Sequence, residues 1–440
     1  MNSTHKRPWR GAPSLATFES IEPRTMMSAA EPAAAGAARD VQHAALHVHR
    51  HPGRAQPDAR LALALGAEPA TAWSGYGHTP RDIRTAYGFG ALADQGAGQT
   101  IAIVDAYDAP TIASDLAFFD ADPNIALPGT NSNAAGSPGS VYNFFTKVGQ
   151  NGPFAGPNKL PKANGSWAQE VSLDVEWAHA IAPGANILLV EANSNATGDL
   201  LNAVDYARAH ASVVSMSWGA PEYAGEANND FHFTSPSDSR PVTFVASAGD
   251  TGGQREWPAT SPNVVSVGGT TLSFNADATY AGESAWSGSG GGTSAYENLP
   301  AYQANVPSAD TASGTRRSAP DVGYDADPNS GFAVYDSYRY QGRSGWMVFG
   351  GTSAGAPQWA ALVAVADAGR AALSAPKAAL DGVRDVLPAL YDGRVPAADF
   401  HDVATGSTTG GTAAVAGYDQ VTGLGTPFSG QKLIDDLILV

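Results

Sequence analysis

The sequence predicts a doubly wound α/β domain, in which helices flank a mostly parallel sheet. Short continuous apolar runs recur along the chain, as expected of parallel strands that are buried on both faces. Stretches of helical composition and short turns separate these runs, which is the order expected of a parallel sheet covered by helices. In chain order, the strand-like runs are 99–105, 186–191, 213–217, 242–246 and 264–267, and the clearest helix-like stretches are 167–182 and 200–210.

Residues 1–75 differ in composition from the remainder of the chain. Ala, Pro, Arg and His dominate them, and neither helical nor strand periodicity persists, so we expect a disordered leader and linker. One domain at 76–440 accounts for all the predicted strands and helices. Residues 18–29 resemble a short tag found near the start of some exported bacterial surface proteins, and we therefore expect a secreted or cell-surface protein.

Composition and charge exclude several classes of function. The formal net charge of −17 at pH 7 disfavours binding to nucleic acid or to anionic membranes. No 18-residue apolar run exists, so no membrane-spanning helix is expected. The chain has no cysteine, and any metal must therefore be held by oxygen or imidazole ligands. We expect a monomer.

The segment 349–362 is the most informative stretch for chemistry. Gly350 and Gly351 allow a tight turn, Ser353 stands where a helix begins, and Pro357 is tolerated only in the first turns of that helix. Backbone N–H groups and a helix N-terminus beside the hydroxyl favour attack on a carbonyl and stabilise the oxyanion that forms. An ordinary helix cap at Gly-Thr-Ser is the alternative interpretation.

A candidate base lies in the predicted helix at 167–182. Glu170 and Asp174 are spaced i, i+4 and therefore lie on one helix face within mutual reach. Two such carboxyls titrate jointly, so that one can accept a proton while the other orients it. The same pattern is also typical of a solvated helix face.

Together these motifs identify the chain from about residue 76 to its end as similar to the sedolisins, the serine-carboxyl peptidases of the subtilisin-like clan. Gly-Thr-Ser-Ala-x-x-Pro is the nucleophile signature of that clan, and none of the ten histidines stands in the His-Gly-Thr-His motif of subtilisins. The matching segments appear in the family's order: 79–89, 170–174, 217–219, 248–250, 286–292, 320–322 and Ser353.

The resemblance implies a subtilisin-like fold and a secreted endopeptidase that hydrolyses polypeptides through an acyl-enzyme on Ser353. It makes Glu170 the general base, Asp174 the group that orients Glu170, and protonated Asp250 the donor to the oxyanion. A carboxylate base with an ordinary pKa is half ionised only in acid, so an acidic pH optimum is expected. Asp105 is either a further acid of this network or a strand-end residue with local hydrogen bonds.

The resemblance also implies one structural calcium ion near the C-terminus. By matching positions, Asp402 and Asp419 provide carboxylates, and Val403, Val415 and Gly417 provide backbone carbonyls. Such an all-oxygen set suits a hard cation. A glycine-rich surface loop with two solvated aspartates is the alternative.

Two rival functions remain open at the level of sequence. The sedolisins usually have a large N-terminal prodomain, and only about 75 low-complexity residues precede the matching start here. A catalytically inactive surface or binding protein on the same scaffold is therefore one alternative. A Ser-His-Asp enzyme that uses Asp105 is the other, and the lack of a suitable histidine motif disfavours it.

Overall fold

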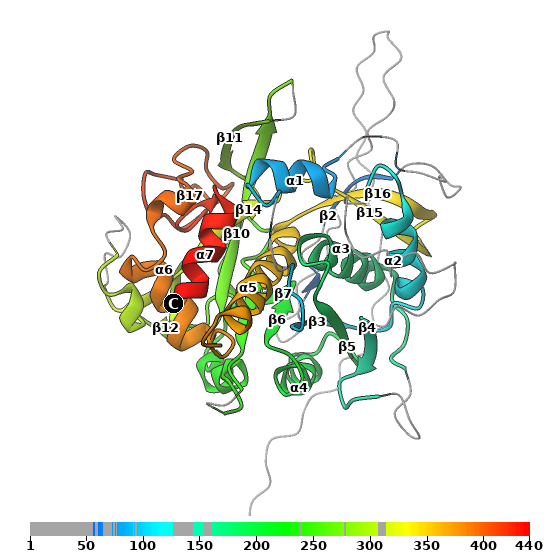
Figure 1. Cartoon of the computed structure of the whole chain (residues 1–440), viewed down its shortest axis with the longest axis horizontal. Helices are drawn as coiled ribbons and strands as arrows, with labels where there is room; N and C mark the ends of the chain where they lie inside the picture. Colours follow the sequence, from blue (N-terminus) through cyan, green and yellow to red (C-terminus); the bar gives the residue numbers. More distant parts are fainter. Residues whose placement is uncertain are drawn as a thin grey trace, which may run out of the picture. The chain divides into compact units, whose positions relative to one another are not determined.

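A computed structural model of the chain describes residues 56–57, 60–64, 73, 75, 77–90, 92, 95–125, 144–153, 160–237, 240–276, 279–306 and 314–440. The described residues form one compact unit (Figure 1). Most of the segment 1–75, including the tag-like residues 18–29, lies outside the described residues, and the domain boundary at residue 75 remains a prediction.

The central sheet has eight strands and confirms the predicted fold class. Its order is β11-β10-β8-β6-β3-β5-β4, with β14 paired to β10. All neighbours are parallel except β11, which is antiparallel to β10. The strands are β3 (Thr100–Ala106), β4 (Phe145–Gly149), β5 (Asn186–Ala192), β6 (Val213–Met216), β8 (Thr243–Ser247), β10 (Val265–Phe274), β11 (Tyr280–Ala285) and β14 (Val322–Asp325).

Helices α3, α4 and α5 pack on the strands of this sheet. The helices of the described residues are α1 (Pro80–Ala86), α2 (Ile112–Ala121), α3 (Gly165–Ile181), α4 (Thr197–Arg208), α5 (Gly355–Ala372), α6 (Leu387–Asp392) and α7 (Gly430–Leu439). Because side chains alternate along a strand, β3 sends Ile101 and Ile103 into the core with α3 and α5, and Ala102 and Val104 into a second core with α4. The sheet is thus doubly wound, as expected.

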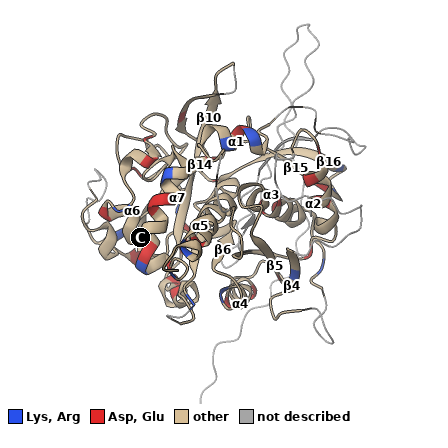
Figure 2. Cartoon of the chain, in the orientation of Figure 1, with Lys and Arg blue, Asp and Glu red and all other residues tan. Residues whose placement is uncertain are grey.

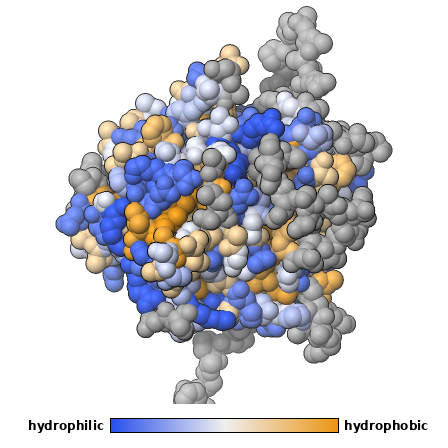
Figure 3. Space-filling model, in the orientation of Figure 1, coloured by the Kyte–Doolittle hydropathy of each residue, from blue (hydrophilic) through white to orange (hydrophobic). Residues whose placement is uncertain are grey.

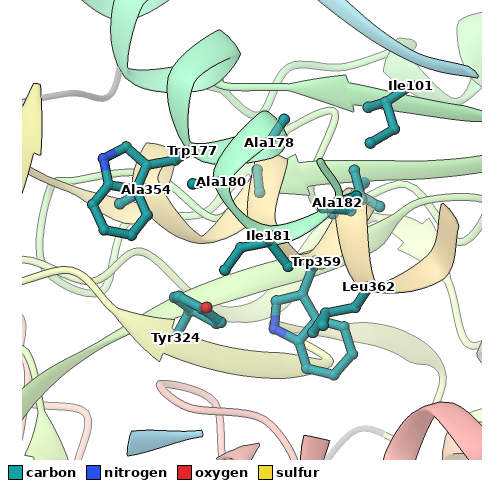
Figure 4. Close-up of a cluster of buried hydrophobic side chains, with 14 of the residues drawn as sticks. Ile101, Trp177, Ala178, Ala180, Ile181, Ala182, Tyr324, Ala354, Trp359 and Leu362 are labelled. Atoms are coloured by element: carbon teal, nitrogen blue, oxygen red, sulfur yellow. The ribbon is translucent and has the colours of Figure 1, made fainter. Parts of the chain in front are cut away.

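The larger core joins α3 to α5. Trp177 and Ile181 of α3 lie in one apolar cluster with Trp359 and Leu362 of α5 and with Tyr324 of β14 (Figure 4). These side chains are nearly or fully removed from water. Burying a large apolar side chain contributes roughly 1.5–3 kcal/mol, so this cluster holds the two helices firmly against each other.

Smaller sheets surround the central one. β7 (Trp218–Pro221) pairs with β1 (Gln56–Pro57) and β9 (Glu256–Trp257), and β16 (Arg343–Gly350) pairs with β2 (Arg60–Ala64) and β15 (Phe332–Tyr340). Two further pairs are β12 (Gly292–Asn298) with β13 (Arg316–Ala319) and β17 (Phe400–His401) with β18 (Thr426–Pro427). Short helical turns are η2 (Glu226–Phe233), η3 (Ala301–Gln303), η4 (Thr352–Ala354), η5 (Gly382–Val386) and η6 (Ala397–Asp399).

The surface carries charges of both signs. Blue and red segments are interspersed along the ribbon among uncharged residues (Figure 2). The face seen in Figure 3 is largely hydrophilic, with small apolar areas between polar ones. Within the described part of the chain, no helix combines the length and the apolar character that crossing a membrane requires.

Candidate active site

Ser353 stands in a tight turn between β16 and α5, where the sequence places the candidate nucleophile. β16 ends at Gly350, Gly351 has a φ of 114°, and η4 leads directly into α5. That φ lies in a region that only glycine adopts readily. The Ser353 side chain is buried and its Oγ accepts or donates no hydrogen bond among the described residues. Ser353 therefore does not cap the helix, and the cap interpretation is wrong.

Asp250 is hydrogen-bonded to Thr352, the residue before the candidate nucleophile. Its Oδ1 accepts hydrogen bonds from Thr352 N at 2.8 Å and from Thr352 Oγ1 at 2.9 Å. The same Thr352 hydroxyl accepts a bond from Gly249 N at 3.1 Å. The Ser217 hydroxyl donates to the Ser353 carbonyl at 3.4 Å. Three segments that are distant in sequence thus meet at the turn.

Glu170 and Asp174 lie on α3, as expected. Asn164 starts this helix, because its side chain accepts hydrogen bonds from the N–H groups of Ser166 and Trp167. α3 packs against both η4 and α5. Both carboxyls have no exposed surface, which excludes the solvated-face interpretation.

A second acidic group lies at the end of the central strands. Asp105 of β3 is fully buried, and burial raises the pKa of its carboxyl to about 8. Neither of its oxygens forms a hydrogen bond with the described residues, so it is not a strand-end residue with local bonds. Its neighbour Val104 accepts a bond of 2.8 Å from Trp218 Nε1, which links β3 to β7.

The sequence analysis did not identify Glu191, a second buried acid of this region. Glu191 lies opposite Asp105 on β5, is fully buried, and lies 3.4 Å from Lys147 Nζ. Burial raises the pKa of Glu191 to about 8, and the lysine opposes this shift. Only the parallel register of β3 and β5 brings the two acids together. Asp105 and Glu191 each end a predicted strand, and this shared position is the sequence signal that could have identified the pair.

No described histidine reaches the nucleophile. His78 and His179 lie 3.3 Å from Asp325 and Asp120, and His232 lies 3.0 Å from Asp205. The two remaining described histidines stack on tyrosines. Within the described part of the chain, the candidate base for Ser353 is therefore a carboxyl group and not an imidazole.

The predicted calcium loop folds back on itself. Gly417 N donates to both oxygens of the exposed Asp402 carboxylate at 3.0 Å, which joins the two halves of the loop. Among the described loop and turn bonds, no backbone N–H donates to the carbonyls of Val403, Val415 or Gly417. Carbonyl and carboxylate oxygens are the ligands that suit a hard cation.

Asp419 is placed differently from Asp402. It is buried and its carboxylate already accepts four bonds, the longest of which is 3.3 Å from Val415 N. Desolvation raises its pKa, against the effect of these donors. Across the described ranges, no three His, Asp or Glu side chains gather as a metal cluster. A cation here would therefore depend on two carboxylates and on carbonyl groups.

The chain was compared with known proteins. The model of the subtilase family (Peptidase_S8) matches residues 161–387. Kumamolisin from Bacillus sp. (strain MN-32) is 33% identical over 399 residues, which is 82% of this chain and 64% of that protein. Sedolisin from Pseudomonas sp. (strain 101) is 27% identical over 413 residues, covering 85% and 63% of the two chains.

Further relatives agree with these two. Xanthomonalisin from Xanthomonas sp. (strain T-22) is 25% identical over 452 residues, with 88% of this chain and 49% of that protein covered. Among solved structures, Pseudomonas sedolisin in complex with pseudo-iodotyrostatin superimposes with a TM-score of 0.65 at 24% identity, over 82% of this chain and 98% of that one. The chain spans 49–64% of the length of these curated relatives. It belongs to the subtilase family, and the sedolisin membership that its motifs predict is confirmed.

Proposed function

We propose that the chain is a serine-carboxyl endopeptidase that hydrolyses polypeptides in acid. The observation that carries the proposal is the attachment of Asp250 to Thr352, directly beside Ser353, in a turn that packs against the helix of Glu170 and Asp174. A nucleophile, two helical acids and an acid at the oxyanion position are the parts that such a reaction needs.

In the proposed reaction, Glu170 accepts the proton of the Ser353 hydroxyl as Oγ attacks the peptide carbonyl carbon. The carbonyl oxygen becomes an oxyanion and accepts a hydrogen bond from protonated Asp250. Glu170 then gives its proton to the leaving amine as the C–N bond breaks and an acyl ester forms on Ser353. Water repeats the sequence with Glu170 as base, and the ester is hydrolysed. Asp174 shares a proton with Glu170 and keeps it oriented.

The acidic working range follows from two opposite requirements. Glu170 must be ionised to act as a base, and Asp250 must be protonated to act as a donor. Carboxyl groups near their ordinary pKa values of about 4 meet both conditions together only in acid. We propose that the enzyme acts outside the cell, which is consistent with a working range below cytoplasmic pH.

We also propose that the loop of Asp402 and Asp419 holds one calcium ion with a stabilising role. The exposed Asp402 carboxylate supports it, as do the carbonyls of Val403, Val415 and Gly417, to which no described backbone N–H of a loop or turn donates. When bound, the ion would crosslink the two halves of the loop. It takes no part in the proposed reaction.

One experiment tests the proposed activity. Purified protein is incubated with a denatured protein substrate across about pH 3 to 8, beside Ser353→Ala, Glu170→Gln and the exposed control Ser273→Ala. We expect peptides to appear in acid with the unmodified chain and with Ser273→Ala only. Absence of cleavage at every pH would favour a noncatalytic binding protein. Cleavage at neutral pH that survives Glu170→Gln would favour a different base.

A further inference from the structure

A cavity of about 200 Å³ is formed by the end of β7, the loop that follows Asp250, and β12. Its lining residues are Pro221, Glu222, Gly253, Gln254, Arg255, Ala295 and Tyr296. The middle segment of this lining begins three residues after Asp250 in the chain. Loops that carry reacting groups commonly also bind the substrate. The cavity is therefore placed where a part of the substrate other than the scissile bond can be held.

Arg255 is fixed in orientation at one side of this cavity. Its Nε donates to Glu222 Oε2 at 3.1 Å, and Glu222 N donates to the Arg255 carbonyl oxygen at 3.3 Å. The stem of Arg255 passes over Gly292, where an added Cβ would lie 3.3 Å from Arg255 Cγ. These contacts hold the guanidinium plane through its Nε edge alone.

The outer edge of the guanidinium group is free. Among the described residues, Arg255 Nη1 and Nη2 have no hydrogen-bond partner, and the side chain keeps 45% of its surface exposed. Within the same described ranges, the Gln254 amide and the Tyr296 hydroxyl also form no side-chain hydrogen bond. Polar groups with unused hydrogen-bonding capacity that line one cavity are typical of a site for a polar ligand.

The acids near the cavity leave this edge of Arg255 available. The Glu222 carboxylate also accepts bonds from the Ser294 hydroxyl and, at 3.1 Å, from the backbone N–H of the next residue. Glu226 and Glu297 interact with Glu222, and burial raises their pKa values to about 9 and about 8. Both are therefore uncharged in acid. The pair of Arg255 and Glu222 leaves the cavity close to neutral, with two donors unused.

We infer that Arg255 binds a carboxylate of the polypeptide substrate in this cavity, from either an acidic side chain or the C-terminus. The inference rests on the proposed function and names its substrate class. A guanidinium group holds a carboxylate through two parallel charge-assisted hydrogen bonds, whereas an amide of the same shape offers one neutral oxygen. A glutamate should therefore be preferred over a glutamine at the residue that reaches Arg255.

Binding to Ser353→Ala tests this inference apart from catalysis. Capped alanine hexapeptides that carry one glutamate, or one glutamine, at each position in turn are titrated by calorimetry at about pH 5.5, where the glutamate side chain is ionised. Alanine hexapeptides with a free or an amidated C-terminus test the terminal carboxylate alone. We expect either one glutamate position or the free C-terminus to bind at least about tenfold more tightly than its uncharged counterpart. The position that does so identifies the source of the carboxylate.

Three further variants assign the preference to the cavity. Adding Arg255→Gln should reduce it to within about twofold. Arg394 is the matched control, because its Nε also lies 2.9 Å from an acid, Asp392, and its side chain is 42% exposed. Arg394→Gln should leave the preference unchanged. Gln254→Glu adds a like charge to the cavity and should also abolish the preference, so the test holds even if Arg255→Gln does not fold.

Several outcomes would overturn the inference. These are equal binding of every charged peptide and its uncharged counterpart, a preference that persists in Arg255→Gln, or no binding of any peptide. If the preference appears but the unmodified chain cleaves none of the peptides in acid, the endopeptidase proposal fails and the recognition by Arg255 stands. If the peptides are cleaved in acid but bind without any preference, the endopeptidase proposal stands and the recognition by Arg255 fails.

Discussion

The backbone N–H of Thr352 and its hydroxyl both donate to one oxygen of Asp250, at 2.8 Å and 2.9 Å. This fork fixes the position of the acid relative to Ser353, because Thr352 and Ser353 are consecutive residues of one short helical turn. The position of the proposed oxyanion donor thus depends on the same turn as the position of the proposed nucleophile.

Replacing Thr352 with valine should weaken catalysis without removing any proposed catalytic group. Valine keeps the volume but loses the hydroxyl that bonds to Asp250 and to Gly249 N. A lost hydrogen bond to a neutral group costs about 0.5–1.5 kcal/mol, so kcat should fall by roughly twofold to tenfold. Thr352→Ser keeps the hydroxyl and should restore most of the rate. Equal rates for the valine and serine variants would contradict this role.

Replacing Asp250 separates its donor role from its charge. Asp250→Ala should lower kcat by about 10²–10³, as expected for loss of an oxyanion donor. Asp250→Asn retains a donor that does not ionise, so its activity should decline less steeply as the pH rises above about 4. The check is a pH profile of kcat for both variants. If kcat of Asp250→Asn falls with rising pH as steeply as kcat of the unmodified chain, the ionisation that causes the fall belongs to another group.

The protein should lose stability as the pH rises. Burial raises the pKa of Asp105, Glu191 and Glu297 to about 8 and that of Glu226 to about 9. These carboxyls stay protonated in the fold at pH values where the unfolded chain has already ionised, so the folded state binds more protons. The free energy of unfolding should therefore be highest below about pH 4 and should fall by up to about 1.4 kcal/mol per pH unit for each group.

Urea denaturation at several pH values measures this effect. Glu226→Gln removes one of the groups and should flatten the slope between about pH 5 and 8. The exposed Asp435→Asn is the matched control and should leave the slope unchanged. Stability that rises from pH 5 to pH 8 would show that these acids are ionised in the fold.

Calcium should raise the thermal stability of the unmodified chain and not that of Asp402→Ala. The carboxylate of Asp402 is exposed, so its removal should change the metal-free Tm little. In excess calcium, the free energy of unfolding of the unmodified chain should rise with the logarithm of the ratio between the calcium concentration and the Kd. Differential scanning calorimetry with calcium and with a chelator gives both values. An equal calcium response in the two proteins would mean that calcium binds elsewhere or that the proposed site does not exist.

The sequence predicts the central strands well and the assembled site only through its motifs. The five apolar runs match β3, β5, β6, β8 and the start of β10, because strands buried on both faces need continuous apolar side chains. The helical composition of 167–182 predicts a helix for Glu170 and Asp174, and both residues lie on α3. Their burial was not predictable, since it depends on how α3 packs against the turn of Ser353.

Contacts across the fold carry the information that local patterns lack. Thr352 attracts no notice in the sequence, because its significance comes from its hydrogen bonds with Asp250 and Gly249, which are distant in the chain. The strands at 56–57 and 60–64 lie in a segment whose composition shows no periodicity, and their partners β7 and β16 lie far along the chain. Such pairing is determined by the partner strands and is invisible in local composition.

The separation of α3 from the turn of Ser353 has a consequence during biosynthesis. The helix with both acids is complete at Ile181, and the nucleophile follows more than 150 residues later. A ribosome-bound chain can therefore bring the two acids and the candidate nucleophile together only after most of the domain has been translated. Contacts between residues so distant in sequence are slow to form, so the proposed peptidase activity should be absent from the nascent chain.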